Sequence, residues 1–522
     1  MSIMRLLDQA LDFEPLPGEL AAMQAQADAA GLLSFAKAVK EGGGRFVSLW
    51  GTDERERGAG YALHVAFCVA EGLALVTLQL PADAPDYPDL EPLFPAANRQ
   101  QRATRDLLGM RALGGDKRPW LRHNNWPPDF FPLRRDCDAS QQFPPQPEDY
   151  PFVRVEGEGV HEIAVGPIHA GIIEPGHFRF SNVGEKVLRL EQRMGWTHKG
   201  VEKRFEQMTL VEGHRLAGRV SGDSTVAYAW AYCLAAESLC GTPVPPRAQW
   251  LRALLLERER VANHLGDLGY LGNDAALAFG LSQFMRLRED WLRLSAELFG
   301  HRLLMDCVCP GGVAVGVDLS AGAAAKLVEQ CAAIEREVRI LKHIYDEHAG
   351  LQDRFITTGR LEPRLAAELS ISGLAGRASS QTWDLRLHNA IAPYAELDVQ
   401  LASHRAGDVA ARVTVRFEEL FESLRLIKEI AARLPAGERC APLAAVGSGR
   451  DGAMGVGWIE GWRGDILVAL AADGDGRIRR CHCHDPSWNI WPALEHAVMG
   501  NIVPDFPLIN KSFNLTYSGA DL

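Results

Sequence analysis

Residues 219–224 read Arg-Val-Ser-Gly-Asp-Ser and precede an apolar run that predicts a helix. Ser221 and Ser224 have the spacing of a paired metal ligand, but they offer hydroxyl oxygens where a soft metal would require thiolate sulfurs. Serine is also among the most favourable residues at the first position of a helix. A helix cap is therefore the favoured interpretation, and an oxygen-ligated site for a hard cation is the alternative; Asp223 would serve either.

A second candidate, Cys-His-Cys-His, ends a predicted strand at residues 481–484. Because side chains alternate between the two faces of a strand, the two cysteines share one face and the two histidines the other. The four side chains cannot converge on one zinc ion without a bulge, so a structural role is favoured. All ten cysteines are irregularly spaced and none forms a Cys-x-x-Cys pair, which argues against a disulfide framework.

The totals restrict the class of protein. The chain has 522 residues, a net charge of −12 and 47% apolar residues, which is typical of a soluble globular protein with more than one domain. No basic run offsets the negative charge, so nucleic acid is not an expected partner. No stretch reaches about 18 apolar residues, so any link to a membrane is expected to run through partner subunits.

The elements that must position these residues fall into two parts. Residues 1–136 predict a small α+β domain, with strands at 47–53, 61–69 and 73–80 separated by charged residues or glycine. Residues 137–152 are rich in proline, glutamine and acidic side chains and are interpreted as a linker.

Residues 153–522 predict a mainly helical domain with small β-sheets at its two ends, so the fold class is α+β. Helices are expected at 247–269, 319–349 and 407–434, and strands close the chain at 454–484. In the second helix a buried stripe is expected from apolar residues spaced three and four apart: Leu327, Cys331, Ile334, Val338 and Leu341.

Several segments, in the same order along the chain, carry a family resemblance. They resemble the large subunit of membrane-bound, energy-converting nickel–iron hydrogenases of the formate-hydrogenlyase type, which is related to the quinone-site subunit of respiratory complex I. The segments are 166–180, 195–206, 257–269, 310–313, 376–386, 407–423 and 459–466. Residues 87–136 resemble the small peripheral-arm subunit of complex I, so the chain looks like a fusion of the two.

The resemblance implies that the nickel ligands have been replaced. The family holds its metals with four cysteines, and the matching positions here are Ser221, Ser224, Thr516 and Gly519, with Asn514 where an aspartate is expected. Hydroxyls and a glycine do not replace soft thiolates. No metal is therefore expected in this chain, and an active nickel–iron hydrogenase is only a remote alternative.

The quinone contacts of complex I are also lost. Its loop carries two histidines, of which the first matches His169 and the second matches Ile173, and its tyrosine matches Gly222. His169 and His198 are equally well interpreted as structural histidines or as residues lining a cavity.

Charged residues of the family's pocket do remain. The resemblance implies catalytic roles for Glu202, as a proton carrier, and for Lys199, Arg219 and Arg463. Further cavity candidates are His169, His198, Asp223, Asp384 and Arg386. A buried acid beside guanidinium groups can handle protons, although an ordinary ion pair of Glu202 with Lys199 or Lys203 is the alternative.

The resemblance implies a redox subunit at the cytoplasmic face of the inner (cytoplasmic) membrane. An iron–sulfur small subunit would dock near residues 160–230 and 500–522, and antiporter-like and other integral membrane subunits would lie below. This chain would bind no cofactor of its own, and electrons from the partner's clusters would reach an acceptor such as a quinone. The alternative is a non-catalytic scaffold that couples shape changes between the two arms.

Overall fold

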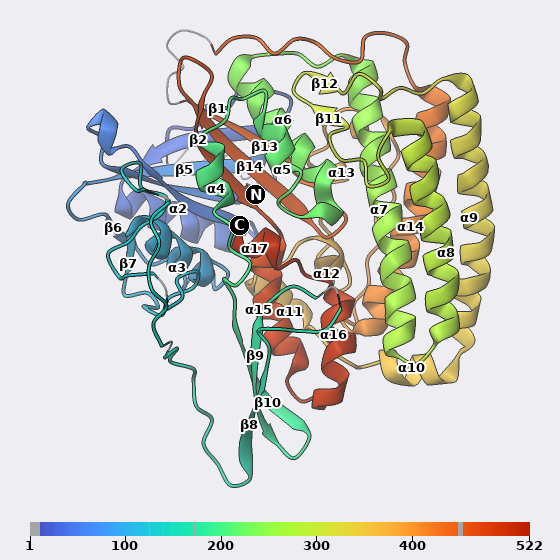
Figure 1. Ribbon diagram of the computed structural model, residues 1–522, viewed down its shortest axis with the longest axis horizontal. Helices are drawn as coiled ribbons and strands as arrows, with labels where there is room; N and C mark the ends of the chain where they lie inside the picture. Colours follow the sequence, from blue (N-terminus) through green and yellow to red (C-terminus); the bar gives the residue numbers. More distant parts are fainter. Residues whose placement is uncertain (1–10, 125, 139, 148, 172, 447–452) are drawn as a thin grey trace.

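The computed structural model describes residues 11–124, 126–138, 140–147, 149–171, 173–446 and 453–522. Its N-terminal part contains a five-stranded sheet with the order β1-β2-β5-β4-β3, drawn in blue in Figure 1. The strands are β1 (Glu14–Pro15), β2 (Ala22–Ala27), β3 (Arg45–Asp53), β4 (Tyr61–Val69) and β5 (Gly72–Leu80). The three strands predicted for this part are confirmed.

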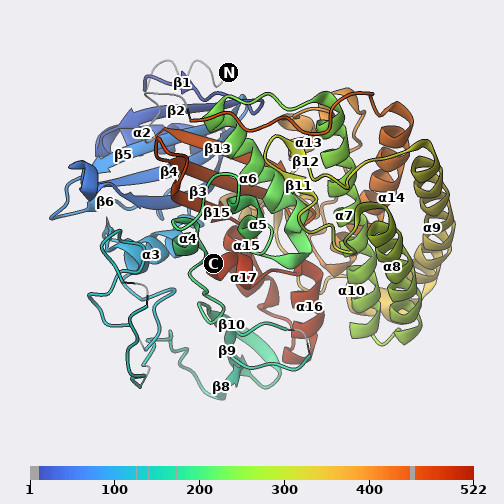
Figure 2. The same ribbon diagram turned by 45° about the horizontal axis from the view of Figure 1, so that its top comes forward.

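The N-terminal sheet is covered rather than exposed to water. Helix α2 (Ala29–Glu41) packs on β2 and β5, and α3 (Ala97–Leu108) packs on β3. All nine residues of β4, which lies between β5 and β3, are buried. Strand β3 also contacts a strand from the C-terminal half of the chain. Figure 2 shows this close packing between the first and last parts of the sequence.

Two three-stranded antiparallel sheets follow, as expected for the second domain. The first, with the order β10-β9-β8, projects from the molecule at the bottom of Figure 1. The second, β13-β14-β15, lies at the centre. Their strands are β8 (Val160–Val165), β9 (His177–Val183), β10 (Lys186–Arg193), β13 (Met454–Glu460), β14 (Asp465–Ala472) and β15 (Ile478–His484).

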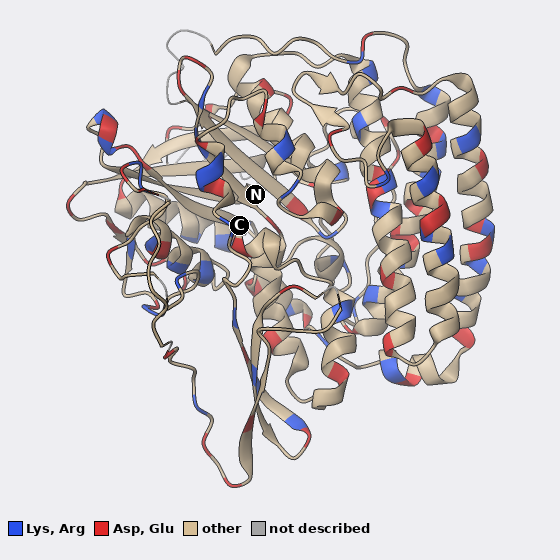
Figure 3. Ribbon diagram, viewed as in Figure 1, with Lys and Arg blue, Asp and Glu red and all other residues tan. Residues whose placement is uncertain are grey.

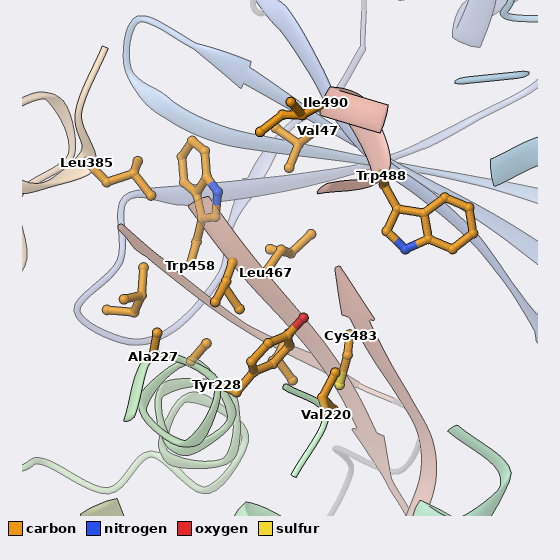
Figure 4. Packing of buried hydrophobic residues seen from close by; sticks show 14 of the residues in the cluster. Val47, Val220, Ala227, Tyr228, Leu385, Trp458, Leu467, Cys483, Trp488 and Ile490 are labelled. Carbon is orange, nitrogen blue, oxygen red and sulfur yellow. The ribbon is translucent and has the colours of Figure 1, made fainter. Parts of the chain in front are cut away.

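The central sheet packs directly against helix α6 (Thr225–Cys240). Glycine makes the close approach feasible: a Cβ atom added at Gly457 would lie 1.8 Å from the carbonyl oxygen of Ala231. Figure 4 shows Ala227 and Tyr228 of this helix facing Leu467 and Cys483 of the sheet. Every residue of α6 is buried, so the helix forms the centre of the core.

Four long helices form a bundle on the opposite side from the N-terminal sheet (Figure 1). They are α7 (Pro246–Asp274), α8 (Ala278–Phe299), α9 (Ala321–Glu347) and α14 (Val409–Arg433). The predicted stripe of α9 is buried as expected, and Lys, Arg, Asp and Glu residues recur along the rest of the helix (Figure 3). The amphipathic pattern of α9 thus reflects a helix that covers α14 and α8 and faces water on its other side.

Shorter elements connect these layers. They are β6 (Asp86–Pro88), β7 (Arg111–Leu113), α4 (Val201–Phe205), α5 (Gly213–Ala217), β11 (Val308–Cys309), β12 (Gly312–Val313), α10 (Ala349–Phe355), α11 (Pro363–Glu368), α12 (Gly373–Arg377), α13 (Leu385–His388), α15 (Ser487–Val498), α16 (Phe506–Phe513) and α17 (Ser518–Asp521), with 3₁₀ turns η1 (Arg55–Arg57), η2 (Gly222–Ser224), η3 (Tyr394–Glu396) and η4 (Val503–Asp505). The predicted α+β class is confirmed. Within the described ranges, no helix combines the length and apolar character needed to cross a bilayer.

Candidate functional site

The four positions at which the resemblance expects metal ligands lie together in the structure. Ser221 precedes η2 and Ser224 is its last residue, just before α6; Thr516 precedes α17 and Gly519 lies within it. The hydroxyl oxygens of Ser221 and Thr516 are 3.1 Å apart across 295 residues of sequence. The Gly519 amide donates to the Thr516 hydroxyl at 3.1 Å. We call these four residues and their immediate partners the replaced-ligand site.

The helix-cap interpretation of the two serines is correct in position but wrong in mechanism. Ser221 and Ser224 occupy the N-cap positions of η2 and α6, yet neither side chain makes a capping hydrogen bond. A carboxylate from α7 caps α6 instead: Glu259 accepts hydrogen bonds from the backbone amides of Val226 at 2.6 Å and Ala227 at 3.2 Å. The serine hydroxyls are therefore left to bond to Asp223 and Thr516.

Arg463 is the central charged residue of the replaced-ligand site. Its guanidinium donates to the Asp223 carboxylate at 2.7 Å, to the Ser224 hydroxyl at 3.3 Å and to the backbone carbonyl of Asn514 at 2.6 Å. Burial acts to raise the pKa of Asp223, but Arg463 and the serine hydroxyls outweigh it and hold that pKa below its usual range. The pair is thus ionised at neutral pH, and it fixes the ends of two distant segments.

The donors at this site do not fit a nickel–iron centre. Three positions offer hydroxyls and one is a glycine, whereas nickel and low-valent iron prefer thiolates. The space is also occupied: a Cβ atom added at Gly519 would lie 2.4 Å from the Thr516 methyl group and 2.8 Å from an Asp485 carboxylate oxygen. In the described part of the chain, no group of three or more His, Cys, Asp or Glu side chains is arranged to hold a metal ion.

Glu202 lies apart from Arg463 in a second polar cluster. It comes from α4, is 5% exposed, and contacts two residues of β15: His482 Nδ1 at 2.8 Å and Arg480 Nη2 at 3.1 Å. Although burial opposes ionisation, Arg480 lowers the pKa of Glu202 to about 2. The expected alternatives do not hold, because Lys203 pairs with Glu206 at 2.9 Å and the exposed Lys199 has no ion pair among the described residues.

His482 connects Glu202 to the N-terminal sheet. Its Nε2 lies 2.8 Å from the Ser48 hydroxyl, and its ring stacks on Trp50 with a centroid separation of 4.7 Å. Burial lowers the pKa of His482, so the ring is neutral, donates through Nδ1 to ionised Glu202 and accepts from Ser48. Glu202, His482 and Ser48 come from three different segments, and all three line a small cavity of about 30 Å³ between the two parts of the chain.

The Cys-His-Cys-His segment of β15 alternates as the sequence predicts. The sulfur atoms of Cys481 and Cys483 lie 4.0 Å apart on one face, and His482 points from the other face toward Glu202. His484 is buried, and burial lowers its pKa to about 3. The contacts of Arg480 and His482 with Glu202 cannot be predicted from local sequence, since Glu202 lies 278 and 280 residues away.

Other predicted site residues are satisfied elsewhere. Arg219 is part-exposed and pairs with Asp306, on the loop after α8. His198 Nδ1 lies 2.7 Å from the backbone carbonyl of Asp521, and His169 Nε2 lies 2.8 Å from that of Gly176. These contacts are those of structural histidines.

Asp384 and Arg386 belong to a third cluster, deep between α7, α13, α14 and β13. Arg386 donates to Asp384 at 2.8 Å and to Glu257 at 3.2 Å, and Arg377 contacts Glu460 at 2.7 Å. Arg386 and Arg377 lower the pKa of Asp384, whereas burial and the charge of Asp384 raise the pKa of Glu460 to about 7. The structure therefore distributes the predicted site residues over separate clusters.

Comparisons with known proteins agree with this arrangement of parts. The model of the 30 kDa subunit of respiratory-chain NADH dehydrogenase matches residues 25–143, and that of the 49 kDa subunit matches residues 271–446. Formate hydrogenlyase subunit 5 of Escherichia coli is 31% identical over 489 residues, which are 92% of this chain and 85% of the relative. The C/D subunit of NADH-quinone oxidoreductase from Phocaeicola vulgatus is 27% identical over 451 residues, 82% of this chain and 85% of the relative.

A solved structure shares the fold. A chain of the membrane-bound sulfane sulfur reductase, an archaeal respiratory membrane complex, superposes with a TM-score of 0.65 and 23% identity over 70% of this chain and 99% of that chain. Fold and sequence together define a hydrogenase-like, complex I-like subunit of membrane-bound respiratory complexes. The chain belongs to the family of formate hydrogenlyase large subunits, related to the 49 kDa subunit of complex I and fused to a 30 kDa-like domain. Its sequence contains no Cys-x-x-Cys pair.

Proposed function

We propose that this chain is a peripheral-arm subunit that couples electron transfer from an iron–sulfur partner to ion translocation, without nickel–iron chemistry. Electrons would pass to an acceptor such as a quinone near the replaced-ligand site. The observation that carries the proposal is the ion pair of Arg463 and Asp223, which lies where the family's metals would lie and is joined to both replaced-ligand segments.

The chemistry available at this site is electrostatic. A guanidinium offers several N–H donors in a fixed plane, and Arg463 is 3% exposed, so its charge is weakly screened by water. A carbonyl acceptor gains negative charge on reduction, and a preorganised cation stabilises that charge. The neighbouring hydroxyls of Ser221 and Ser224 supply further polar contacts. Arg463 would therefore favour the reduced form of an acceptor that approaches it.

Glu202 is better suited to orientation than to proton transfer. A carboxyl group with a pKa of about 2 is almost always ionised at neutral pH and is a poor general acid there. In this proposal Glu202 holds His482 in one tautomer against Ser48. Lys199 and Arg219 are exposed or part-exposed and would contribute at the surface.

Exposed apolar side chains support the proposed partner surface. Ile168 is 87% exposed and Ile173 is 51% exposed, in the loop between β8 and β9, and Trp196 is 38% exposed nearby in sequence. Exposed apolar side chains that lie close together, as the two isoleucines of this loop do in sequence, can mark interaction sites. We propose that the iron–sulfur subunit docks over 160–230 and 500–522, that antiporter-like and other integral membrane subunits complete the complex, and that it lies at the cytoplasmic face of the inner membrane.

A specific observation favours a second candidate, a non-catalytic coupler. The Thr516 methyl group and Asp485 already fill the space beside Gly519, so the former metal position offers little room for a substrate. In that case the three clusters would only transmit shape changes between the partner subunit and the membrane arm.

One experiment separates the two candidates. The complex is isolated from native membranes, its iron–sulfur clusters are reduced, and their reoxidation by a soluble quinone analogue is followed by electron paramagnetic resonance. For the redox role we expect reoxidation that slows at least about tenfold in Arg463→Ala, since losing a charged hydrogen bond costs about 1.5–3 kcal/mol. Glu202→Gln should slow it less. No reoxidation, or equal rates in Arg463→Ala and the unaltered chain, would contradict the redox role and support the non-catalytic coupler.

A further inference from the structure

A cleft distinct from the small cavity described above lies between α7, α8 and the η2 turn. Its volume is about 100 Å³, several times the ~10–15 Å³ that one water needs. Gly222 and Asp223 form one wall, α7 and α8 form two others, and residues 302–304 close the fourth. The charged and polar side chains that line it are Asp223, Arg258, Glu259, Asn263, Arg288, Ser295 and Arg302.

Arg258 is a buried guanidinium whose partners are all neutral. It is 0% exposed, donates to the Ser295 hydroxyl at 2.9 Å and to the Trp291 carbonyl at 3.0 Å, and stacks on the Trp291 ring at 3.9 Å. No carboxylate pairs with it among the described residues. Burial lowers its pKa to about 9. A buried charge without a counter-ion costs several kcal/mol, so a negative charge at this position is favoured.

Arg288, on α8 and half-buried, also lines the cleft without a carboxylate partner in the described part of the chain. Its Nε donates to the Ala262 carbonyl at 3.0 Å, and no carboxylate within the described ranges pairs with its terminal nitrogens. The third arginine of the lining differs, because Arg302 pairs with Glu289 at 2.6 Å. Arg293, outside the lining, pairs with the same glutamate at 3.0 Å. The two arginines that line the cleft without a carboxylate thus stand out from their neighbours.

The acids lining the cleft do not neutralise these two guanidiniums. Asp223 is bonded to Arg463 at 2.7 Å, and both carboxylate oxygens of Glu259 accept backbone amides at the start of α6. The positive charge of Arg258 and Arg288 is therefore left for something that enters the cleft.

We propose that this cleft is a binding site for a small oxyanion or monocarboxylate, held by the terminal nitrogens of Arg288 and by the charge of Arg258. The planar fork of a guanidinium matches two oxygens of such an ion. The volume admits an ion of a few heavy atoms. The site is distinct from the replaced-ligand site and shares only the η2 turn with it, so it does not rest on the proposed redox role.

The test is saturable binding of inorganic phosphate and of acetate to the full-length chain, measured by isothermal titration calorimetry at fixed ionic strength. Arg288→Gln removes the fork, Arg288→Lys keeps the charge without the fork, and Arg293→Gln on the same helix is the matched control. We expect the unaltered chain and Arg293→Gln to bind at least one of the two ions with the same affinity. Arg288→Gln should bind at least about tenfold more weakly, since a charge-assisted hydrogen bond contributes about 1.5–3 kcal/mol.

Arg288→Lys should fall between the two. Circular dichroism would show whether Arg288→Gln folds. If it does not, Arg288→Lys is the variant to measure, because its ammonium group maintains the net charge of the cleft. Absence of saturable binding of both ions to the unaltered chain would overturn the proposal. Equal affinities in the unaltered chain and both Arg288 variants would overturn it as well.

Discussion

The contribution of Glu202 to the free energy of unfolding can be predicted, because this carboxylate is buried and its partners are Arg480 and His482. The drop in the pKa of Glu202 from 4.5 to about 2 corresponds, at about 1.4 kcal/mol for each pKa unit, to about 3 kcal/mol. The substitution Glu202→Gln keeps the shape of the side chain but leaves the buried Arg480 without its counter-ion. Breaking a buried ion pair typically costs about 3–5 kcal/mol. Both routes give a loss of about 3 kcal/mol in the free energy of unfolding at pH 7.

Urea unfolding of the full-length chain, followed by tryptophan fluorescence, measures this loss. The matched control is Arg204→Gln, an exposed residue of the same helix α4, for which we expect a change within about 0.5 kcal/mol. The folded-state pKa of Glu202 lies below its unfolded value, so its contribution is complete above about pH 4.5 and is lost as the pH falls toward 2. The difference between Glu202→Gln and the unaltered chain should therefore shrink between pH 4.5 and pH 3.

A loss of less than about 1 kcal/mol at pH 7, equal to that of the control, would refute the reasoning. A loss of the same size at pH 7 and pH 3 would refute the electrostatic cause. It would indicate instead that the substitution disturbs the contacts from position 202 through His482 to Ser48.

Three further predictions concern the other clusters. Gly519→Ala should lower the free energy of unfolding by about 1–3 kcal/mol, measured by urea unfolding, because the new Cβ atom meets the Thr516 methyl group at 2.4 Å; an unchanged value would mean that the site has free space. Arg463→Ala should raise the pKa of Asp223, measured by the pH dependence of unfolding, and no shift would contradict the ion pair. The folded-state pKa of Glu460, about 7, lies above its ordinary value of 4.5, so its contribution is present below pH 4.5 and is lost as the pH rises through 7. Glu460→Gln should flatten the decline in stability over that window, and an unaltered pH profile would argue against a raised pKa.

Local sequence patterns predicted several of the regular elements, although the long helix α8 was not among them. The spacing of Leu327, Cys331 and Val338 predicts the buried stripe of α9 because a helix of that length repeats its apolar side every three to four residues. Strand alternation likewise places Cys481 and Cys483 on one face of β15.

Contacts between residues far apart in the sequence could be predicted only in part. The family resemblance pairs the Ser221 and Thr516 segments, which the structure brings to 3.1 Å, and no local pattern could do so. Neither sequence nor resemblance identified His482 as the partner of Glu202, or Glu259 as the residue that caps α6. Both partners depend on how distant elements pack, and a serine at an N-cap position does not reveal that a buried carboxylate has already satisfied the helix amides.

The central claim is that the family's metal position has been rebuilt around Arg463 and Asp223, so that the subunit works without nickel. The most direct measurement is the ratio of nickel to this chain in the complex isolated from native membranes, determined by elemental analysis alongside iron. The account predicts iron from the partner's clusters and nickel far below one atom per chain, unchanged by the paired substitution of Ser221 and Ser224 with alanine. One nickel per chain that is lost when those serines are replaced would contradict it.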